Sequence, residues 1–190
     1  MDNVIITIGR ENGSGGREVG QILSRKLGLE CYDRQIVEES AVRAEMTVKE
    51  AERMEENPRT GSKLFFGGIP SANPLFEKQS EIIREFAKNG PCIFVGRCAD
   101  YVLRNRDDIV NVFITAPISD RINRSAERNG TSAKDAYAHI IEKDTARADY
   151  YLRYTGRSWG SASNYHVTLN SGPIGTEACA DLIIEYIDRI

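Results

Sequence analysis

A glycine-rich segment near the start of the chain has the composition of a loop that binds phosphate. The segment reads IGRENGSGGRE and places four glycines within the eight residues 9–16. Glycine-rich turns that open a helix expose backbone N–H groups, which attract a polyanion to the helix N-terminus. The residues expected to cradle phosphate are Gly13, Ser14, Gly15 and Gly16. The alternative is that these glycines only make a tight turn between a strand and a helix.

The charges of this segment differ from those of the usual P-loop. That pattern, GxxxxGK[ST], carries a lysine that reaches the β- and γ-phosphates of a nucleotide. When residues 13–15 are aligned with the glycine end of the pattern, Gly16 stands where the lysine belongs. The missing charge could come from Arg17 or from Arg10, because a guanidinium can hold phosphate oxygens at two points. Glu18 could help to hold Mg²⁺, directly or through water.

Short apolar runs alternate with amphipathic segments and would position this loop. The runs expected to be strands are residues 4–8, 29–32, 92–95, 110–114 and 166–169. Residues 4–8 are expected to be buried on both faces, and 92–95 and 110–114 are further candidates for buried strands. The segments expected to be helices are residues 17–27, 33–43, 47–56, 74–89, 118–128, 132–154 and 176–190. Asp33 and Thr47 have side chains suited to capping the helices they begin, and Glu50 follows Thr47 at capping-box spacing.

The alternation of these segments predicts the fold class. Five strands separated by helices favour a three-layer α/β fold, with a parallel sheet of about five strands and helices on both faces. In such a sheet the ligand crevice lies at the carboxyl ends of the strands, where the glycine segment would also lie. Residues 57–73 contain glycines and prolines without a clear period, which predicts a mobile functional loop.

The composition is that of an ordinary globular protein. Of its 190 residues 41% are hydrophobic and 28% are charged, and the formal net charge is −3. This length favours one domain with its own core. The slightly acidic balance disfavours a general nucleic-acid binder, which would more often be basic.

The cysteines and the apolar runs indicate the cellular setting. The four cysteines are widely spaced and suggest neither a metal ribbon nor a dense disulfide framework. The apolar runs are too short for a membrane span, and the N-terminal residues resemble a strand rather than a signal sequence. We therefore expect a cytoplasmic protein without a membrane or nucleic-acid partner. The sequence points to no particular oligomeric state.

Several segments together resemble the cytidylate kinase-like family, a branch of the nucleoside monophosphate kinases. They are VIITIGRENGSGGREVGQILSRKLG, CYDRQIVEESA, IFVGRCADYVLR, VNVFITAPISDRINR and DTARADYYLRYTGRSWGSASNY. RENGSGGRE and TGRSWG followed by SNY are specific to that branch, and the segments span nearly the whole chain. The resemblance implies a P-loop-type domain that transfers the γ-phosphoryl group of ATP, with Mg²⁺, to a nucleoside monophosphate, with CMP or dCMP preferred.

The resemblance also implies roles for individual residues. ATP would be held by Gly13, Ser14, Gly15, Gly16, Arg17 and Glu18; catalytic charge would come from Arg17, Arg147 and Arg153; the acceptor would contact Asp33, Arg34, Arg97, Arg124 and Asp144. Residues 44–75 would be a mobile element that covers the acceptor, and residues 142–160 a lid over the phosphates, within one domain spanning residues 1–190. Arginines converging on the crevice are the expected chemistry, because positioning and charge cancellation dominate phosphoryl transfer.

Two departures from that family's pattern keep other functions open. The cytidylate kinases have an aspartate directly after the GR of the third strand, but Cys98 stands there in this chain and Asp100 comes two residues later. The missing lysine is the larger departure, because it normally stabilises transition-state charge. The alternatives are a nucleotide- or anion-binding regulatory module that has lost phosphoryl transfer, and a kinase that acts on a different acceptor.

Other residues have a structural interpretation beside the functional one. Arg121, Arg124 and Arg128 could simply form a solvated helix face paired with acidic neighbours. Trp159 could stack on a base or anchor a loop by packing. Tyr150, Tyr151 and Tyr154 have the spacing of a helix face that packs on the sheet. His139 and His166 lie far apart without a neighbouring ligand, so we expect no metal site formed by the protein alone.

Overall fold

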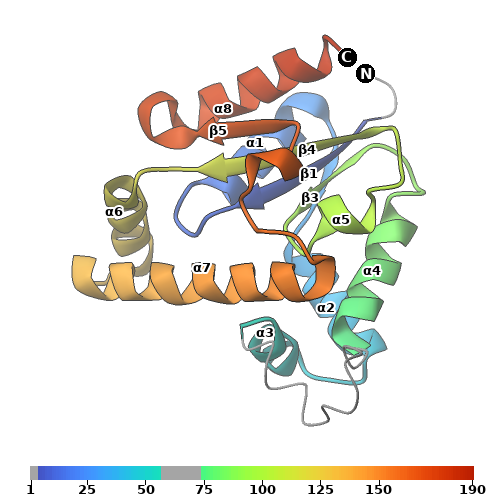
Figure 1. Cartoon of the computed structure of the whole chain (residues 1–190), viewed down its shortest axis with the longest axis horizontal. Helices are drawn as coiled ribbons and strands as arrows, with labels where there is room; N and C mark the ends of the chain where they lie inside the picture. The colour runs from blue at the N-terminus through green and yellow to red at the C-terminus, as the bar shows by residue number, and fades with distance from the viewer. Residues whose placement is uncertain (1–3, 57–73) are drawn as a thin grey trace.

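The protein is described by a computed structural model, which covers residues 4–56 and 74–190. It contains a five-stranded parallel sheet in the order β2-β3-β1-β4-β5 (Figure 1). The strands are β1 (Ile5–Arg10), β2 (Glu30–Tyr32), β3 (Cys92–Val95), β4 (Ile109–Thr115) and β5 (Val167–Asn170). The predicted parallel α/β sheet is therefore confirmed, and each predicted strand is found within two residues of its expected bounds.

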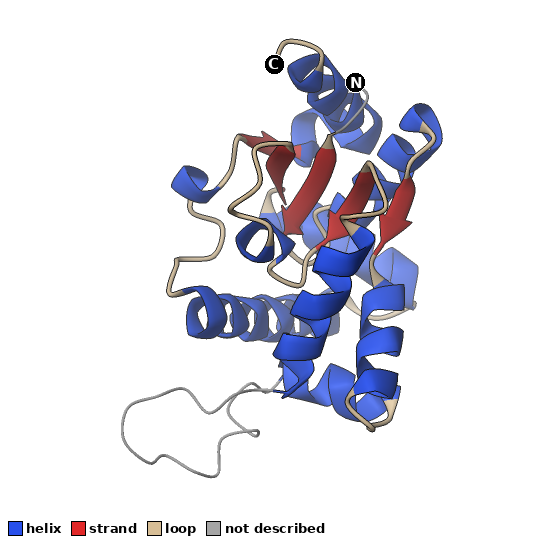
Figure 2. Ribbon diagram, turned by 90° about the vertical axis from the view of Figure 1, so that its right-hand side faces the viewer, coloured by secondary structure: helices blue, strands red, loops and turns tan. Residues whose placement is uncertain are grey.

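Helices surround this sheet (Figure 2). They are α1 (Gly16–Leu27), α2 (Arg34–Arg43), α3 (Val48–Glu56), α4 (Pro74–Phe86), α5 (Ala99–Val102), α6 (Ile118–Asn129), α7 (Ala133–Thr155) and α8 (Ser171–Ile187), with a short 3-10 turn η1 (Ala162–Asn164). In the described part of the chain, no helix is both long enough and apolar enough to cross a membrane.

Two buried clusters hold the helices against opposite faces of the sheet. On one face, Val19 and Leu23 of α1 and Ile183 of α8 pack against Ile6 and Ile8 of β1. The other face is covered by α4 and α5, whose buried residues include Ile82, Ile83, Ala99 and Val102. Strand β1 contributes to both clusters, with Ile6 and Ile8 on the first face and Ile5 on the second, because successive side chains of a strand point to opposite faces of a sheet.

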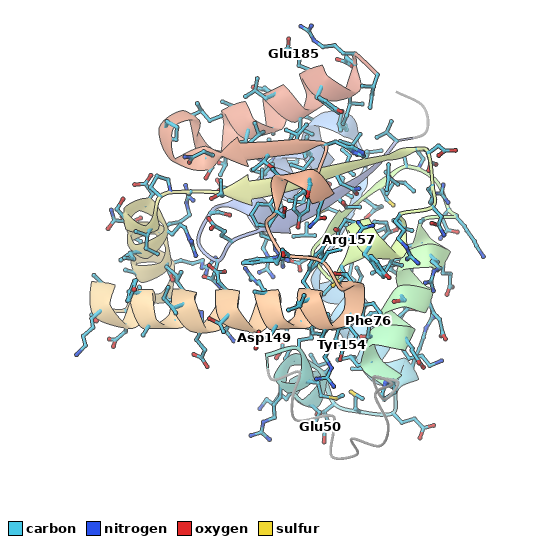
Figure 3. All side chains as sticks on the ribbon, in the orientation of Figure 1. Glu50, Phe76, Asp149, Tyr154, Arg157 and Glu185 are labelled. Atoms are coloured by element: carbon cyan, nitrogen blue, oxygen red, sulfur yellow. The ribbon has the colours of Figure 1, made fainter. Side chains whose placement is uncertain are left out.

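The helix α7 lies across the loops that leave the carboxyl ends of β1 and β3. Asp144 accepts a hydrogen bond from the backbone of Asn12 at 2.7 Å, and Tyr151 donates one to Asp100 at 2.5 Å. Near its C-terminal end α7 also meets α4, where the rings of Tyr154 and Phe76 stack with centroids 4.4 Å apart (Figure 3). This long helix therefore closes the edge of the sheet where a ligand is expected.

One predicted helix cap is confirmed, a second is absent, and the last helix begins earlier than expected. The side chains of Thr47 and Glu50 bond each other's backbone N–H groups at 3.2 and 2.7 Å, which confirms the capping box. Asp33 occupies the position before α2 but its side chain caps nothing there. The last helix begins at Ser171 rather than 176, because Asn170 caps a first turn that is separated from the rest at Gly175.

The structure describes in full one of the two segments that were expected to move, and only part of the other. Residues 57–73, which were predicted to form a mobile loop within the 44–75 element, lie outside the described residues. The preceding part of that element forms α3. Most of the segment expected to be a lid, residues 142–155, belongs to the continuous helix α7.

A buried hydrogen bond between neighbouring strands gives a first test of the fold. Thr7 faces Asn111 across the β1–β4 pair, and its hydroxyl donates to the Asn111 side-chain oxygen at 2.7 Å. We expect Thr7→Val to lower the free energy of unfolding by about 1–3 kcal/mol, because the Asn111 oxygen loses its partner. Urea unfolding measures this change. The exposed substitution Thr131→Val serves as the control, and equal stability of the two variants would contradict the role of this bond.

Candidate active site

The glycine loop that follows β1 ends in an open helix N-terminus. Gly13 and Gly15 have φ values of 80° and 81°, a backbone conformation that other residues rarely adopt. A Cβ atom at Gly13 would lie 2.7 Å from the Arg121 carbonyl oxygen. The first amide of α1 bonded within the helix is that of Val19, to Gly15 at 2.9 Å. The preceding amides of the first turn are therefore free to bind an anion.

Buried ionic contacts fix this loop to α6 and α7. Arg121 donates to the backbone oxygen of Asn12 at 2.8 Å and pairs with Glu11 at 3.3 Å and with Asp144. The expectation of a solvated face is wrong for Arg121, which is buried. Asp144, which was expected to contact the acceptor, holds α7 to the loop through Arg121 and the Asn12 amide.

Asp33 is the shared counter-ion of three arginines. Its carboxylate pairs with Arg17 at 2.5 Å and lies 3.8 and 3.9 Å from Arg10 and Arg97, and only 12% of its side chain is exposed. Burial opposes its ionisation, yet the three arginines hold the pKa of Asp33 below its ordinary value. Of the three, Arg17 alone lies within hydrogen-bonding distance, whereas among the three charges that of Arg10 contributes most to lowering the pKa of Asp33. Asp33 thus arranges the arginines that surround it.

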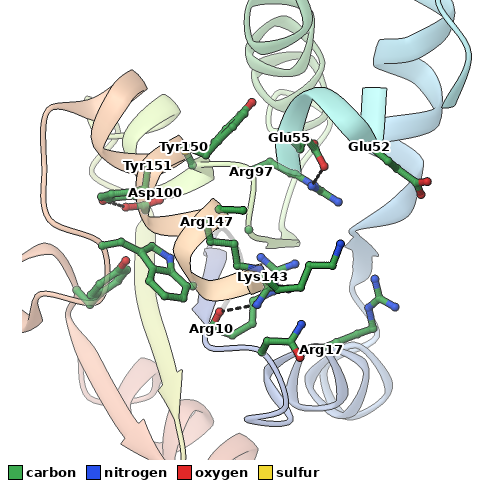
Figure 4. A pocket seen from close by; sticks show the side chains of 17 residues that line it. Arg10, Arg17, Glu52, Glu55, Arg97, Asp100, Lys143, Arg147, Tyr150 and Tyr151 are labelled. Atoms are coloured by element: carbon green, nitrogen blue, oxygen red, sulfur yellow. Dashed lines mark hydrogen bonds and ion pairs between the residues drawn. The ribbon is translucent and has the colours of Figure 1, made fainter. Parts of the chain in front are cut away.

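Two adjoining pockets open beside these arginines. The first, which we name the loop pocket, is lined by Arg10, Glu11, Asn12, Gly13, Gly15, Gly16, Arg17, Glu18, Gln21, Arg25, Arg124, Arg128 and Arg147. The second, the aromatic pocket, is lined by Gly9, Arg10, Asn12, Arg17, Glu52, Glu55, Gly96, Arg97, Cys98, Asp100, Lys143, Ala146, Arg147, Tyr150, Tyr151, Trp159 and Tyr165 (Figure 4). The residues common to both are Arg10, Asn12, Arg17 and Arg147.

Cations lie on one side of the aromatic pocket and aromatic rings on the other (Figure 4). Arg97 follows β3 in a left-handed conformation with φ 58° and pairs with Glu55 of α3. Across the pocket, Tyr151 donates to Asp100, whose pKa is raised by burial although that hydrogen bond opposes the shift. A ligand with an anionic end and a planar, partly polar end fits this division.

Trp159 and two tyrosines of α7 pack against neighbouring side chains and also line the aromatic pocket. Trp159 packs edge-on against Phe113, with ring centroids 5.5 Å apart, and also lines the aromatic pocket. Tyr150 and Tyr151 are buried and line the same pocket. Tyr150 donates a hydrogen bond to Gln79 at 2.9 Å, which fixes its ring. Core packing therefore builds the wall of the pocket.

The structure brings together most of the predicted site residues and separates others. Arg124, expected to contact the acceptor, donates to the Gly13 carbonyl oxygen at 2.7 Å and lines the loop pocket, whereas Arg97, expected to contact the same ligand, lines the aromatic pocket. Arg34 is 70% exposed and pairs with Glu38 at the surface. Arg153 lines neither pocket, because it lies six residues after Arg147 and hence roughly a third of a turn away around α7.

Three charged residues of the aromatic pocket were missed from the sequence. Lys143 shares a helical face with Arg147 and Tyr150, at spacings of four and seven residues, and that periodicity could have revealed it. Glu52 and Glu55 belong to α3, whose sequence resembles an ordinary charged surface helix. Only the packing of α3 near α7 brings these carboxylates to the site.

A divalent cation at this site would need oxygen atoms from a bound phosphate ligand as well as from the protein. Within residues 4–56 and 74–190, no cluster of three or more His, Cys, Asp or Glu side chains is placed to hold a metal ion. Glu11 is engaged by Thr115 at 2.6 Å and by Arg121, whereas Glu18 lines the loop pocket. Mg²⁺ is commonly held by one carboxylate together with substrate phosphates and water, and Glu18 fits that requirement.

Comparison with known proteins places the chain in a kinase-like group. The model of the cytidylate kinase-like family matches residues 5–173. A cytidylate kinase of Pyrococcus horikoshii is 24% identical, over 100% of this chain and 92% of its own. A cytidylate kinase of Aeropyrum pernix is 24% identical, over 93% and 95% of the respective chains.

Solved structures share the same fold. An uncharacterized protein from Eubacterium ventriosum has a TM-score of 0.76 and 24% identity, over 97% of this chain and 98% of its own. A shikimate kinase from Bacteroides thetaiotaomicron has a TM-score of 0.58 and 18% identity, over 97% and 98%. At these identities the likeness concerns the fold, which is that of the P-loop kinases.

The shared carboxylate of Asp33 predicts a pH-dependent stability. Because its pKa is lowered in the folded state, its stabilisation is present above the ordinary value of 3.8 and is lost as the pH falls below it. We expect Asp33→Asn to reduce the free energy of unfolding at pH 7 by about 3 kcal/mol, since the arginines lose their counter-ion. Denaturant unfolding at several pH values measures the difference.

The gap between Asp33→Asn and the parent protein should narrow as the pH is lowered toward 3. The exposed substitution Asp107→Asn provides the matched control and should change stability little at any pH. A difference between Asp33→Asn and the parent that stays constant with pH would contradict an ionic role for Asp33.

Proposed function

The chain belongs to the cytidylate kinase-like family, and from that premise we propose that it transfers the γ-phosphoryl group of ATP to a nucleoside monophosphate, with CMP or dCMP preferred. The observation that carries the proposal is the junction of the two pockets. The loop pocket and the aromatic pocket share three arginines, Arg10, Arg17 and Arg147. A phosphoryl group passing between a donor and an acceptor would cross this junction.

The loop pocket is the proposed donor site. The free amides of the first turn of α1 and the side chains of Arg124 and Arg17 suit the phosphates of ATP. Glu18 would hold Mg²⁺ together with those phosphates, and the cation would neutralise charge on the transferring group. Gly13 and Gly15 allow the close backbone approach that a phosphate requires.

The aromatic pocket is the proposed acceptor site. Arg97, Lys143 and Arg147 line its cationic side and suit the acceptor phosphate. Tyr151 and Asp100 lie on the opposite side (Figure 4), and Trp159 also lines the pocket, so a base would have aromatic surface and a polar group to contact. This arrangement favours a nucleotide over a small acceptor that has no ring.

The neighbouring segments support the same assignment. Glu52 and Glu55 bring α3 to the aromatic pocket, which supports a role for the 44–75 element in covering the acceptor. Arg147 of α7 lines both pockets and Lys143 lines the aromatic pocket, which supports a role for residues 142–160 over the phosphates. These segments and the sheet would then act as one kinase domain, because the contacts of α7 link them.

A coupled-enzyme assay of ADP formation tests the proposal. The protein would be supplied with ATP, Mg²⁺ and each of a panel of acceptors: CMP, dCMP, UMP, AMP, GMP and small non-nucleotide alcohols. We expect the highest kcat/KM with CMP or dCMP. Calorimetric binding of ATP without turnover of any acceptor would instead identify a regulatory anion-binding module. Turnover of a non-nucleotide acceptor alone would identify a different kinase.

The acceptor contact of Arg97 predicts a selective kinetic defect. Arg97→Lys keeps the charge but loses two-point binding of phosphate, so we expect the KM for CMP to rise about tenfold to a hundredfold while the KM for ATP changes little. Steady-state kinetics with each substrate varied in turn measure both constants. Arg84→Lys, at an exposed position of α4, is the control. Equal effects on both KM values would contradict the assignment of Arg97 to the acceptor.

A further inference from the structure

Positions 10 and 16 carry residues that are exchanged relative to the P-loop pattern. When Gly15 is taken as the glycine before the lysine in GxxxxGK[ST], the first glycine of the pattern falls on position 10 and the lysine on position 16. This chain has Arg10 and Gly16 at those positions. A cation has therefore been gained where the pattern has glycine, and a glycine where the pattern has a cation.

The two exchanged positions are in direct steric contact. A Cβ atom at Gly16 would lie 2.4 Å from Cβ of Arg10 and 2.9 Å from its Cγ. These atoms are close to the β1 backbone and cannot swing aside as the end of a long side chain can. The Arg10 side chain thus excludes lysine, or any other side chain, from position 16. The two residues depend on each other.

A second glycine makes room for the far end of the same side chain. A Cβ atom at Gly96 would lie 1.8 Å from Nη1 of Arg10 and 2.8 Å from its Cζ. Gly96 follows β3 and has a φ of 80°. The Arg10 side chain therefore runs from the start of α1 to the turn after β3. Its guanidinium ends at the junction of the two pockets, and it lines both.

The Arg10 guanidinium is largely buried and its donors are not used within the described structure. Its side chain is 13% exposed, and its nearest recorded acceptor is the Asp33 carboxylate at 3.8 Å, too far for a hydrogen bond. Burial, followed by the nearby charge of Arg147, lowers its pKa to about 9, so it stays charged at neutral pH. Asp33 offsets part of its charge without accepting a hydrogen bond, so the guanidinium donors are available to an anionic ligand in the two pockets.

Arg17 is placed less well for the same task. Its side chain is 61% exposed, and its Nε already donates to Asp33 at 2.5 Å. It occupies the position of the pattern's Ser or Thr rather than that of the lysine. The sequence favoured Arg17 because it follows Gly16 directly, but the space that a lysine at position 16 would enter is filled by Arg10.

We propose that Arg10 supplies the charge that the lysine supplies in the usual P-loop, by holding oxygens of the transferring phosphoryl group at the junction of the two pockets. This inference rests on the proposed function. In the reaction, a phosphate oxygen of the acceptor forms a bond to the γ-phosphorus of ATP. The bond from that phosphorus to the bridging oxygen breaks, and the electron pair leaves with ADP. Arg10 stabilises the negative charge on the moving group, and no proton is transferred through it.

Exchange of the two residues back to the usual pattern is the decisive experiment. We expect Arg10→Gln to lower kcat about 10²- to 10³-fold, and Arg10→Lys to recover part of that loss because it restores the charge. Gly16→Lys alone should abolish activity and lower Tm, because its side chain collides with Arg10. The double variant Arg10→Gly with Gly16→Lys should recover kcat to within about tenfold of the parent.

Binding of inorganic tripolyphosphate, measured by calorimetry, gives a readout that does not depend on turnover. Arg10→Gln should weaken it at least tenfold, more than Arg17→Gln does, while Arg84→Gln at the exposed face of α4 should leave it unchanged. Thermal melts of every variant establish that it is folded.

The outcomes separate this inference from the proposed function. If the parent protein turns over no acceptor but Arg10→Gln still weakens tripolyphosphate binding, the function fails and the assignment of Arg10 as the phosphate cation stands. If the parent is active and a folded Arg10→Gln keeps more than about a fifth of its kcat, the inference is overturned. A double variant no more active than Gly16→Lys would also overturn it.

Discussion

Four arginine side chains converge at the carboxyl end of the sheet, and their mutual repulsion constrains the structure around them. They are Arg10, Arg17, Arg97 and Arg147. Like charges a few ångströms apart in a partly buried volume repel by on the order of a few kcal/mol per pair. Three carboxylates offset this repulsion: Asp33 after β2, Glu55 in α3 and Asp144 in α7. Each of these elements is therefore tied to the site by charge as well as by packing.

The compensation is incomplete, and the remaining positive charge gives the site its preference for anions. Asp33 is divided among three arginines, and Asp144 is shared between Arg147 and the buried Arg121. The free amides of the first turn of α1 add a further positive potential at the same place. A polyphosphate supplies the missing negative charge. The same crowding of like charges that lowers the stability of the protein would thus strengthen binding of a nucleotide.

The sequence predicts the frame of this site better than its contacts. Strands β1, β3 and β4 were evident because parallel strands buried on both faces are short continuous apolar runs. The capping box of α3 was evident because it is a local pattern. The roles of Asp33 and Asp144 were not evident, because they depend on partners far along the chain. Asp144, for example, accepts its hydrogen bond from an amide 132 residues earlier. The importance of Arg10 was missed for the same reason, because its close contact with Gly96 joins residues that are far apart in the sequence.

The helix α7 connects the two halves of the site through its periodicity. Asp144 bonds the glycine loop, Arg147 donates to the Arg10 carbonyl oxygen at 3.2 Å, and Tyr151 bonds Asp100 beyond β3. These residues lie three and four positions apart, so they share one face of the helix. Because an α-helix moves as a rigid rod over such a length, displacement of α7 alters the loop pocket and the aromatic pocket together. The two pockets are therefore mechanically linked in this fold. The buried pair of Asp144 and Arg121 resists separation at one end of this contact, and the bond of Tyr151 to Asp100 resists it at the other.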